Sequence, residues 1–125
     1  MVKEEEIINI SPEEKVQKVF LKAIELVGGL KQLCEYRSLT WLPALARAAS
    51  AVVLKEEYHK TDEEIAKELG ITKQTVRNIL QADPEYAKER ISKLKDFMEE
   101  EGKNLKGHTA GSIIKLAYSM LEKNE

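Results

Sequence analysis

The sequence contains few residues of the kinds that build disulfides or metal sites. One cysteine, Cys34, and two histidines, His59 and His108, occur among its 125 residues. A single cysteine forms no disulfide within a chain, and these three side chains are too few for a zinc site with nitrogen and sulfur ligands. We therefore expect a cytoplasmic protein that uses no disulfide, metal or cofactor.

Long hydrophobic runs and an excess of one charge are also absent. No stretch approaches the roughly 20 apolar residues that a membrane span needs, and acids occupy positions 4–6, where a signal peptide would carry bases. The 20 basic and 22 acidic residues give a net charge of −2, which excludes a basic field over the whole protein. We expect no membrane partner, and any contact with nucleic acid has to be local.

Hydrophobic residues make up 42% of the chain, enough for one packed core in a chain of the usual size of one domain. The sequence therefore predicts a single domain over residues 1–125. Asparagine and glutamine are scarce, with four of each, whereas lysine and glutamate abound. That balance is typical of proteins from hot environments.

Only three prolines and six glycines occur, and nearly all stand between segments of helical periodicity. This predicts an all-α protein, a compact bundle of about six to seven helices. An alanine-rich stretch, residues 41–54, carries Arg47 as its only charge and should lie centrally. We expect the Arg47 stem to pack on the core with its head group at the surface, rather than to bridge an acid of another helix. The expected helices span residues 12–27, 30–36, 44–57, 62–69, 73–81, 84–101 and 110–122.

Two short helices near the middle of the chain carry the clearest local signals. Thr61 and Glu64 have the spacing of a capping box at the start of the first helix, and Thr72 can cap the second. Gly70 stands where the turn between the helices favours a left-handed backbone. A turn of only three or four residues therefore joins the two helices.

The side chains of this helix pair divide into an inner and an outer set. Ile71, Val76 and Ile79 fill the wedge between the helices, and Ala66 is small where the helices cross. The outer set, which we call the polar face, contains no acid. The polar face consists of Thr72, Lys73, Gln74, Thr75, Arg77, Asn78 and Gln81.

Over residues 62–81 the pair resembles the helix-turn-helix of DNA-binding regulators, with Ala66 at the fifth place, Gly70 at the ninth and Val76 at the fifteenth. The resemblance implies that residues 73–81 form a recognition helix for the major groove of duplex DNA. It implies a three-helix unit at 41–82, with flanking helices in 1–40 and 84–125. No strand pair is expected after this unit, so it would lack a wing.

The resemblance also makes the polar face the candidate DNA-binding surface. Gln74, Arg77 and Asn78 would reach base edges through paired hydrogen bonds, while Thr72, Thr75 and the helix amides would meet phosphates. One copy would neutralise few phosphates, so its affinity would lie near the nonspecific range of roughly 10⁻⁴ to 10⁻⁶ M. We therefore predict a homodimer.

A longer resemblance covers roughly residues 41–85. It rests on Trp41, Leu42 and Pro43, on the alanine-rich helix, and on the segments 60–70, 75–80 and 83–85. These features resemble a family of small prokaryotic, largely archaeal, proteins described as probable regulatory domains, whose genes lie beside KaiC-like RecA-fold ATPases. The resemblance implies a regulatory role alongside an ATPase and assigns no catalytic or binding residue.

An alternative function uses the same fold without DNA. Helix pairs of this spacing also serve as protein-protein modules, and the acids at 62–64 and Glu68 weaken the positive potential near the presumed groove. Such an adaptor, whose partner could be a KaiC-like ATPase, would bind through an apolar patch. The candidates for that patch are Trp41, Leu42 and Tyr36, if they are exposed.

Enzymatic function has little support. Gly102, Gly107, His108 and Thr109 approximate the spacing of a phosphate-binding loop, but His108 stands where the lysine must be and no strand is expected before them. We expect a loop between helices there. No spacing places a nucleophile beside a base, so we predict no enzyme activity.

Overall fold

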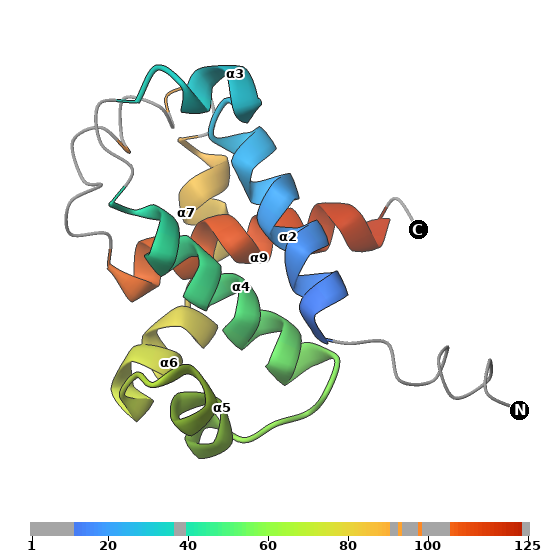
Figure 1. Cartoon of the computed structure of the whole chain (residues 1–125), viewed down its shortest axis with the longest axis vertical. Helices are drawn as coiled ribbons and strands as arrows, with labels where there is room; N and C mark the ends of the chain where they lie inside the picture. The colour runs from blue at the N-terminus through green and yellow to red at the C-terminus, as the bar shows by residue number, and fades with distance from the viewer. Residues whose placement is uncertain (1–11, 37–39, 91–92, 94–97, 99–105, 124–125) are drawn as a thin grey trace, which may run out of the picture.

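The computed structural model describes residues 12–36, 40–90, 93, 98 and 106–123, and all regular structure within them is helical. This confirms the all-α class. Seven α-helices occur in these ranges, arranged as Figure 1 shows. They are α2 (Pro12–Leu26), α3 (Gly29–Leu33), α4 (Leu42–Glu56), α5 (Asp62–Leu69), α6 (Lys73–Leu80), α7 (Pro84–Lys88) and α9 (Gly107–Lys123).

Two helices organise the core. The alanine-rich helix α4 packs against α2, α5, α6 and α9, and α9 packs against α2, α4, α6 and α7. In Figure 1, α9 crosses the middle of the molecule, with α3 at one end and α5 and α6 together at the other. Small side chains on α4 and near the start of α9 let these helices approach their neighbours closely, because little side-chain volume separates the backbones. Arg47 is exposed on α4.

Helices α4, α5 and α6, which all lie within residues 41–82, contact one another. Ile65, Val76 and Ile79 are fully or almost fully buried among them. Helix α7 follows α6 after three residues, in place of a strand pair. None of the helices in the described ranges is long and apolar enough to cross a bilayer.

Helix α9 begins three residues earlier than the sequence predicted. Gly107, His108 and Thr109 form its first turn, so the expectation of a loop at these residues was wrong, and Gly102 lies outside the described residues. The amide of Ala110 donates to the carbonyl oxygen of Lys106 at 3.0 Å, and Thr109 is buried. Burial of this turn against the bundle supplies stabilisation that the local sequence pattern did not show.

The helix expected over residues 84–101 is not continuous, because residues 89 and 90 form a turn. Helix α7 ends at Lys88, and the guanidinium of Arg90 donates to the carbonyl oxygen of Tyr86 at 2.8 Å. This bond satisfies one of the carbonyls that a helix end leaves free, which favours termination there. Of the predicted apolar stripe, Ala87 and Met98 are buried, whereas residues 91 and 94 lie outside the described residues.

The apolar patch suggested for an adaptor does not exist as proposed. Trp41 is 1% exposed and Tyr36 is 7% exposed, and their rings meet edge to face with centroids 5.1 Å apart. The hydroxyl of Tyr36 donates to the carbonyl oxygen of Val27 at 2.9 Å, which ties the end of α2 to the segment before α4. Leu42 is only partly buried. The two aromatic residues are therefore part of the core.

Candidate nucleic-acid interface

A capping box fixes the start of α5. The side-chain oxygen of Thr61 accepts from the amide of Glu64 at 3.1 Å, and the carboxylate of Glu64 accepts from the amide of Thr61 at 2.9 Å. The hydrogen bond from the Thr61 amide lowers the pKa of Glu64 below its usual value of 4.5. The predicted box is confirmed, so the first helix of the pair starts at a defined residue.

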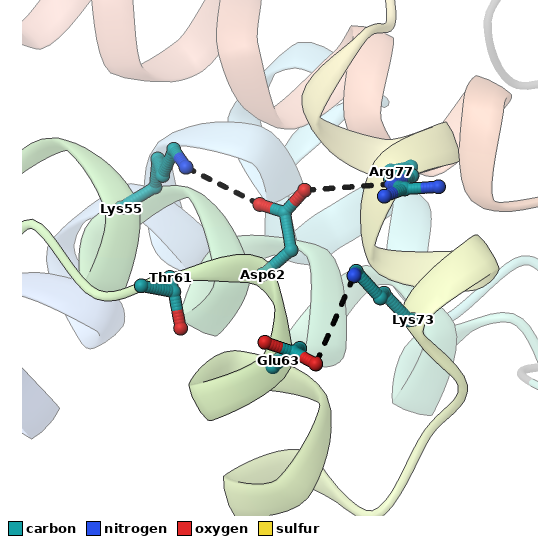
Figure 2. Close-up of a pocket in the computed structure, with 6 residues that line it drawn as sticks. All are labelled: Lys55, Thr61, Asp62, Glu63, Lys73 and Arg77. Atoms are coloured by element: carbon teal, nitrogen blue, oxygen red, sulfur yellow. Dashed lines mark hydrogen bonds and ion pairs between the residues drawn. The ribbon is translucent and has the colours of Figure 1, made fainter.

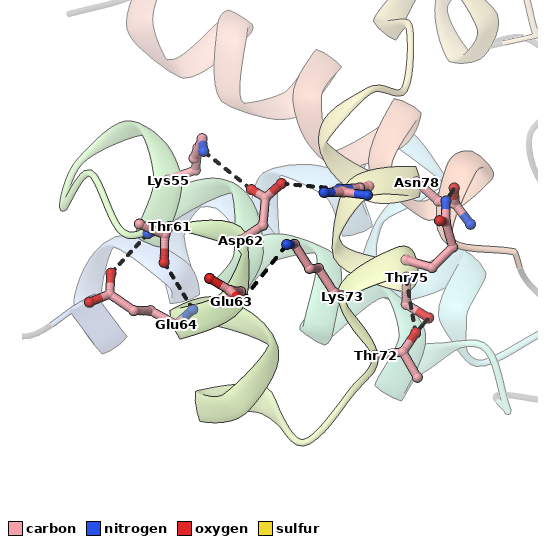
Figure 3. A network of polar contacts seen from close by, with 11 residues as sticks. Lys55, Thr61, Asp62, Glu63, Glu64, Thr72, Lys73, Thr75 and Asn78 are labelled. Carbon is pink, nitrogen blue, oxygen red and sulfur yellow. Dashed lines mark hydrogen bonds and ion pairs between the residues drawn. The ribbon is translucent and has the colours of Figure 1, made fainter.

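The turn between α5 and α6 is as short as predicted. Gly70 adopts a left-handed backbone with φ of 69°, and the amide of Ile71 donates to the carbonyl oxygen of Ala66 at 3.1 Å. Thr72 caps α6 by accepting from the amide of Thr75 at 3.1 Å. The hydroxyls of these two threonines also form a hydrogen bond of 2.8 Å. Figure 3 marks this bond with a dashed line. The path of the chain into α6 is therefore held by hydrogen bonds at the turn.

The inner side of α6 is held from two directions. Val76 and Ile79 pack into the core, and α9 crosses the end of α6 at Gly111. A Cβ atom at Gly111 would lie 2.3 Å from the carbonyl oxygen of Ile79, so only glycine fits this crossing. The ammonium of Lys115 donates to the carbonyl oxygen of Leu80 at 2.6 Å. Helix α6 is thus fixed between the α4–α5 pair and α9.

The polar face projects away from this support. Every one of its seven residues is exposed except Thr75, which is half-buried. Gln74 donates to the side-chain oxygen of Asn78 at 3.0 Å across one helical turn. The first turn of α6 contains no acidic residue, so the positive end of the helix dipole is available to an anion.

Helix α9 borders one edge of the polar face. A Cβ atom at Gly107 would lie 3.5 Å from the Cβ of Asn78 and from the carbonyl oxygen of Thr75. The next residue, His108, is exposed, and its ring meets that of Tyr86 edge to face with centroids 5.2 Å apart. Sequence reasoning placed no helix at this edge because the first turn of α9 was expected to be a loop.

The two cations of the polar face are engaged with acids of α5. Asp62 lies 3.7 Å from Nε of Arg77 and 3.2 Å from Nζ of Lys55, and Glu63 lies 3.9 Å from Nζ of Lys73. Figure 2 shows the Asp62 carboxylate between the two cations that it contacts. Together with Thr61, these residues line an open hollow of about 280 Å³.

This arrangement was not found from the sequence. The acids at the start of α5 were expected to weaken the positive potential near the groove, but not to pair with particular cations. Asp62 and Arg77 are far apart along the chain and lie on different helices, so no spacing rule links them. The nearest sequence signal was the position of Asp62 at a helix start, which the dipole alone explains.

The described residues contain no group of three or more His, Cys, Asp or Glu side chains placed to hold a metal ion. The site is a polar and charged surface on α5 and α6 that offers hydrogen bonds and ion pairs. Comparisons with protein-family models, with curated proteins and with solved structures found no match to this chain. Both resemblances noted in the sequence thus stay predictions.

Proposed function

We propose that this protein is a small transcription-regulator-like protein that binds duplex DNA through the polar face of α6. The observation that carries the proposal is the contrast between the two sides of this helix. Val76 and Ile79 anchor it in the core, while hydrogen-bonding side chains of the kinds that read bases project outward. A rigidly held helix with such a face suits the major groove, which admits an α-helix.

The residues of the polar face divide into two roles in this proposal. Arg77 presents a planar fork of donors that matches the two acceptors of guanine, and the amides of Gln74 and Asn78 match adenine. Thr72 and Thr75 lie at the start of α6, where hydroxyls and free amides would contact phosphates. Lys73 and Gln81 extend the same surface toward the sugar-phosphate backbone of the duplex.

We further propose that two copies act together. The polar face of one chain carries only Lys73 and Arg77 as cations, which is too few for tight binding at physiological salt. Two copies would double these contacts, with half-sites about one helical turn apart, roughly 34 Å. Light scattering of the full chain, free and with DNA, checks this: a monomer under both conditions contradicts it.

The experiment that tests the function is selection of enriched sequences from random duplexes with the full chain, followed by binding titrations. Arg77→Ala should weaken binding to the selected sequence by about 1 to 3 kcal/mol and relax the preference at one position. Arg47→Ala is the matched control, because Arg47 is also exposed but lies on α4. No enrichment, or equal binding by the two variants, contradicts the proposal.

One observation favours a second candidate function. Leu21 and Leu30, on α2 and α3, are 54% and 68% exposed. A contiguous exposed apolar patch marks a surface that binds another protein, and these leucines are the candidates for one. An adaptor, for example one that binds an ATPase, would use these residues in place of the buried Trp41 and Tyr36. Replacing both leucines by lysine should then abolish partner binding, whereas Arg77→Ala should leave partner binding unchanged.

A further inference from the structure

The hollow on the outer side of α5 and α6 brings together groups that compete for the same cations. Lys55, Lys73 and Arg77 line it with only Asp62 and Glu63 as counter-charges. Figure 2 shows that both acids belong to the first turn of α5 and point toward the cations. A phosphate of bound DNA would have to approach these same cations. Each acid therefore lies where a phosphate oxygen would otherwise bind.

Asp62 is the stronger of the two competitors. Its carboxylate is in contact with two cations, and its side chain is 25% exposed. Glu63 reaches only Lys73, at 3.9 Å, and its side chain is 78% exposed. Water screens the Glu63 pair more than the Asp62 pairs. Both sets of contacts remain weak enough for a polyanion to displace, since an exposed ion pair is worth at most about fivefold in an equilibrium constant.

We propose that Asp62, assisted by Glu63, acts as an internal competitor of the DNA backbone: it holds Arg77 in the unbound protein, and a duplex must displace it to bind. This inference rests on the proposed DNA binding and names the residue that limits the affinity for DNA. Because a carboxylate also repels phosphates, the wild-type chain binds DNA less tightly than the polar face alone would allow. Asp62 is therefore a positioning residue that acts through Arg77.

The test compares binding of the full chain and its variants to one duplex at several salt concentrations. Asp62→Asn keeps the size of the side chain and removes its charge. It should tighten binding by about three- to tenfold and make the slope of log affinity against log salt steeper by about one, because the surface that meets the phosphates gains one net positive charge. Glu63→Gln should tighten binding by about twofold, because its pair is longer and more exposed.

Two matched variants separate pairing from a general charge effect. Glu68→Gln removes the same charge from the same helix, but Glu68 does not line the hollow, and its effect should stay below about twofold. In an Arg77→Ala background, the gain from Asp62→Asn should fall below about twofold, because only Lys55 is then released. Thermal unfolding of each variant verifies its fold, and Asp62→Ser replaces Asp62→Asn if that variant fails to fold.

The outcomes distinguish this inference from the proposed function. If neither the wild-type chain nor any variant binds duplexes at any salt concentration, the proposed function fails and the inference fails with it. If the wild-type chain binds but Asp62→Asn binds no more tightly, the inference alone is overturned. The inference is also overturned if Glu68→Gln raises the affinity for DNA as much as Asp62→Asn does. The same holds if Asp62→Asn raises the affinity undiminished in the Arg77→Ala background.

Discussion

The two faces of α6 are held in different ways. On the inner face, Val76 and Ile79 are buried and the backbone of Ile79 meets Gly111 with no room for a side chain. On the polar face, the contacts are hydrogen bonds and ion pairs between exposed or half-buried groups, with distances of up to 3.9 Å. Packing contacts cannot be exchanged without rearranging the core, whereas exposed pairs can be exchanged for a ligand. The position of α6 is thus fixed, whereas the side chains of its polar face can exchange their present partners for a ligand.

The largest expected effect comes from breaking the inner face. Gly111→Ala places a Cβ against the carbonyl oxygen of Ile79, a backbone atom that cannot yield as a side chain would. We expect a loss of about 2 to 3 kcal/mol in the free energy of unfolding, the upper range for overpacking. Urea denaturation measures it.

Gly107→Ala is the control for this prediction. A Cβ there makes only ordinary contacts of 3.4–3.5 Å, although the residue lies on the same helix and beside the same neighbour. Its effect should stay within about 0.5 kcal/mol. Equal losses for the two alanine variants would show that the crossing at Gly111 is not the tight contact that fixes α6.

A smaller effect is expected at the turn, where the two faces meet. Thr72→Ala removes the side-chain oxygen that caps α6 and should cost about 1 kcal/mol of stability. Thr72→Ser keeps the oxygen and should lose much less. Urea denaturation of both variants checks this, and equal losses would assign the effect to the methyl group of threonine instead of the cap.

The smallest effect concerns the start of α5 and depends on pH. The pKa of Glu64 is lowered, so its contribution to stability is present above pH 4.5 and is lost as the pH falls through the lower pKa of the folded state. The difference in unfolding free energy between wild type and Glu64→Gln should therefore shrink as the pH falls below 4.5. A difference that grows toward acid pH would contradict the hydrogen bond to the Thr61 amide as its cause.

The sequence predicted the α5–α6 pair closely because its signals are local. The cap at Thr61, the left-handed Gly70 and the cap at Thr72 each act within three or four residues, a range in which spacing determines contact. The exposed polar face followed from the helical period of Val76 and Ile79.

Other features depend on contacts between distant segments and were missed. The early start of α9 depends on burial of Thr109 in the bundle. The pairing of Asp62 with Arg77 depends on how two helices cross. A helical period reports which side of a helix is apolar, but it does not report which residue of another helix lies opposite.

The most direct test of the central claim is to follow the backbone amide signals of the ¹⁵N-labelled full chain by NMR while duplex DNA is added. The account predicts that the amide signals of residues 72–81 move the most on addition of DNA, and that the amide signals of Leu21 and Leu30 do not move. Shifts concentrated around Leu21 and Leu30, or an unperturbed α6 at saturating DNA, would contradict it.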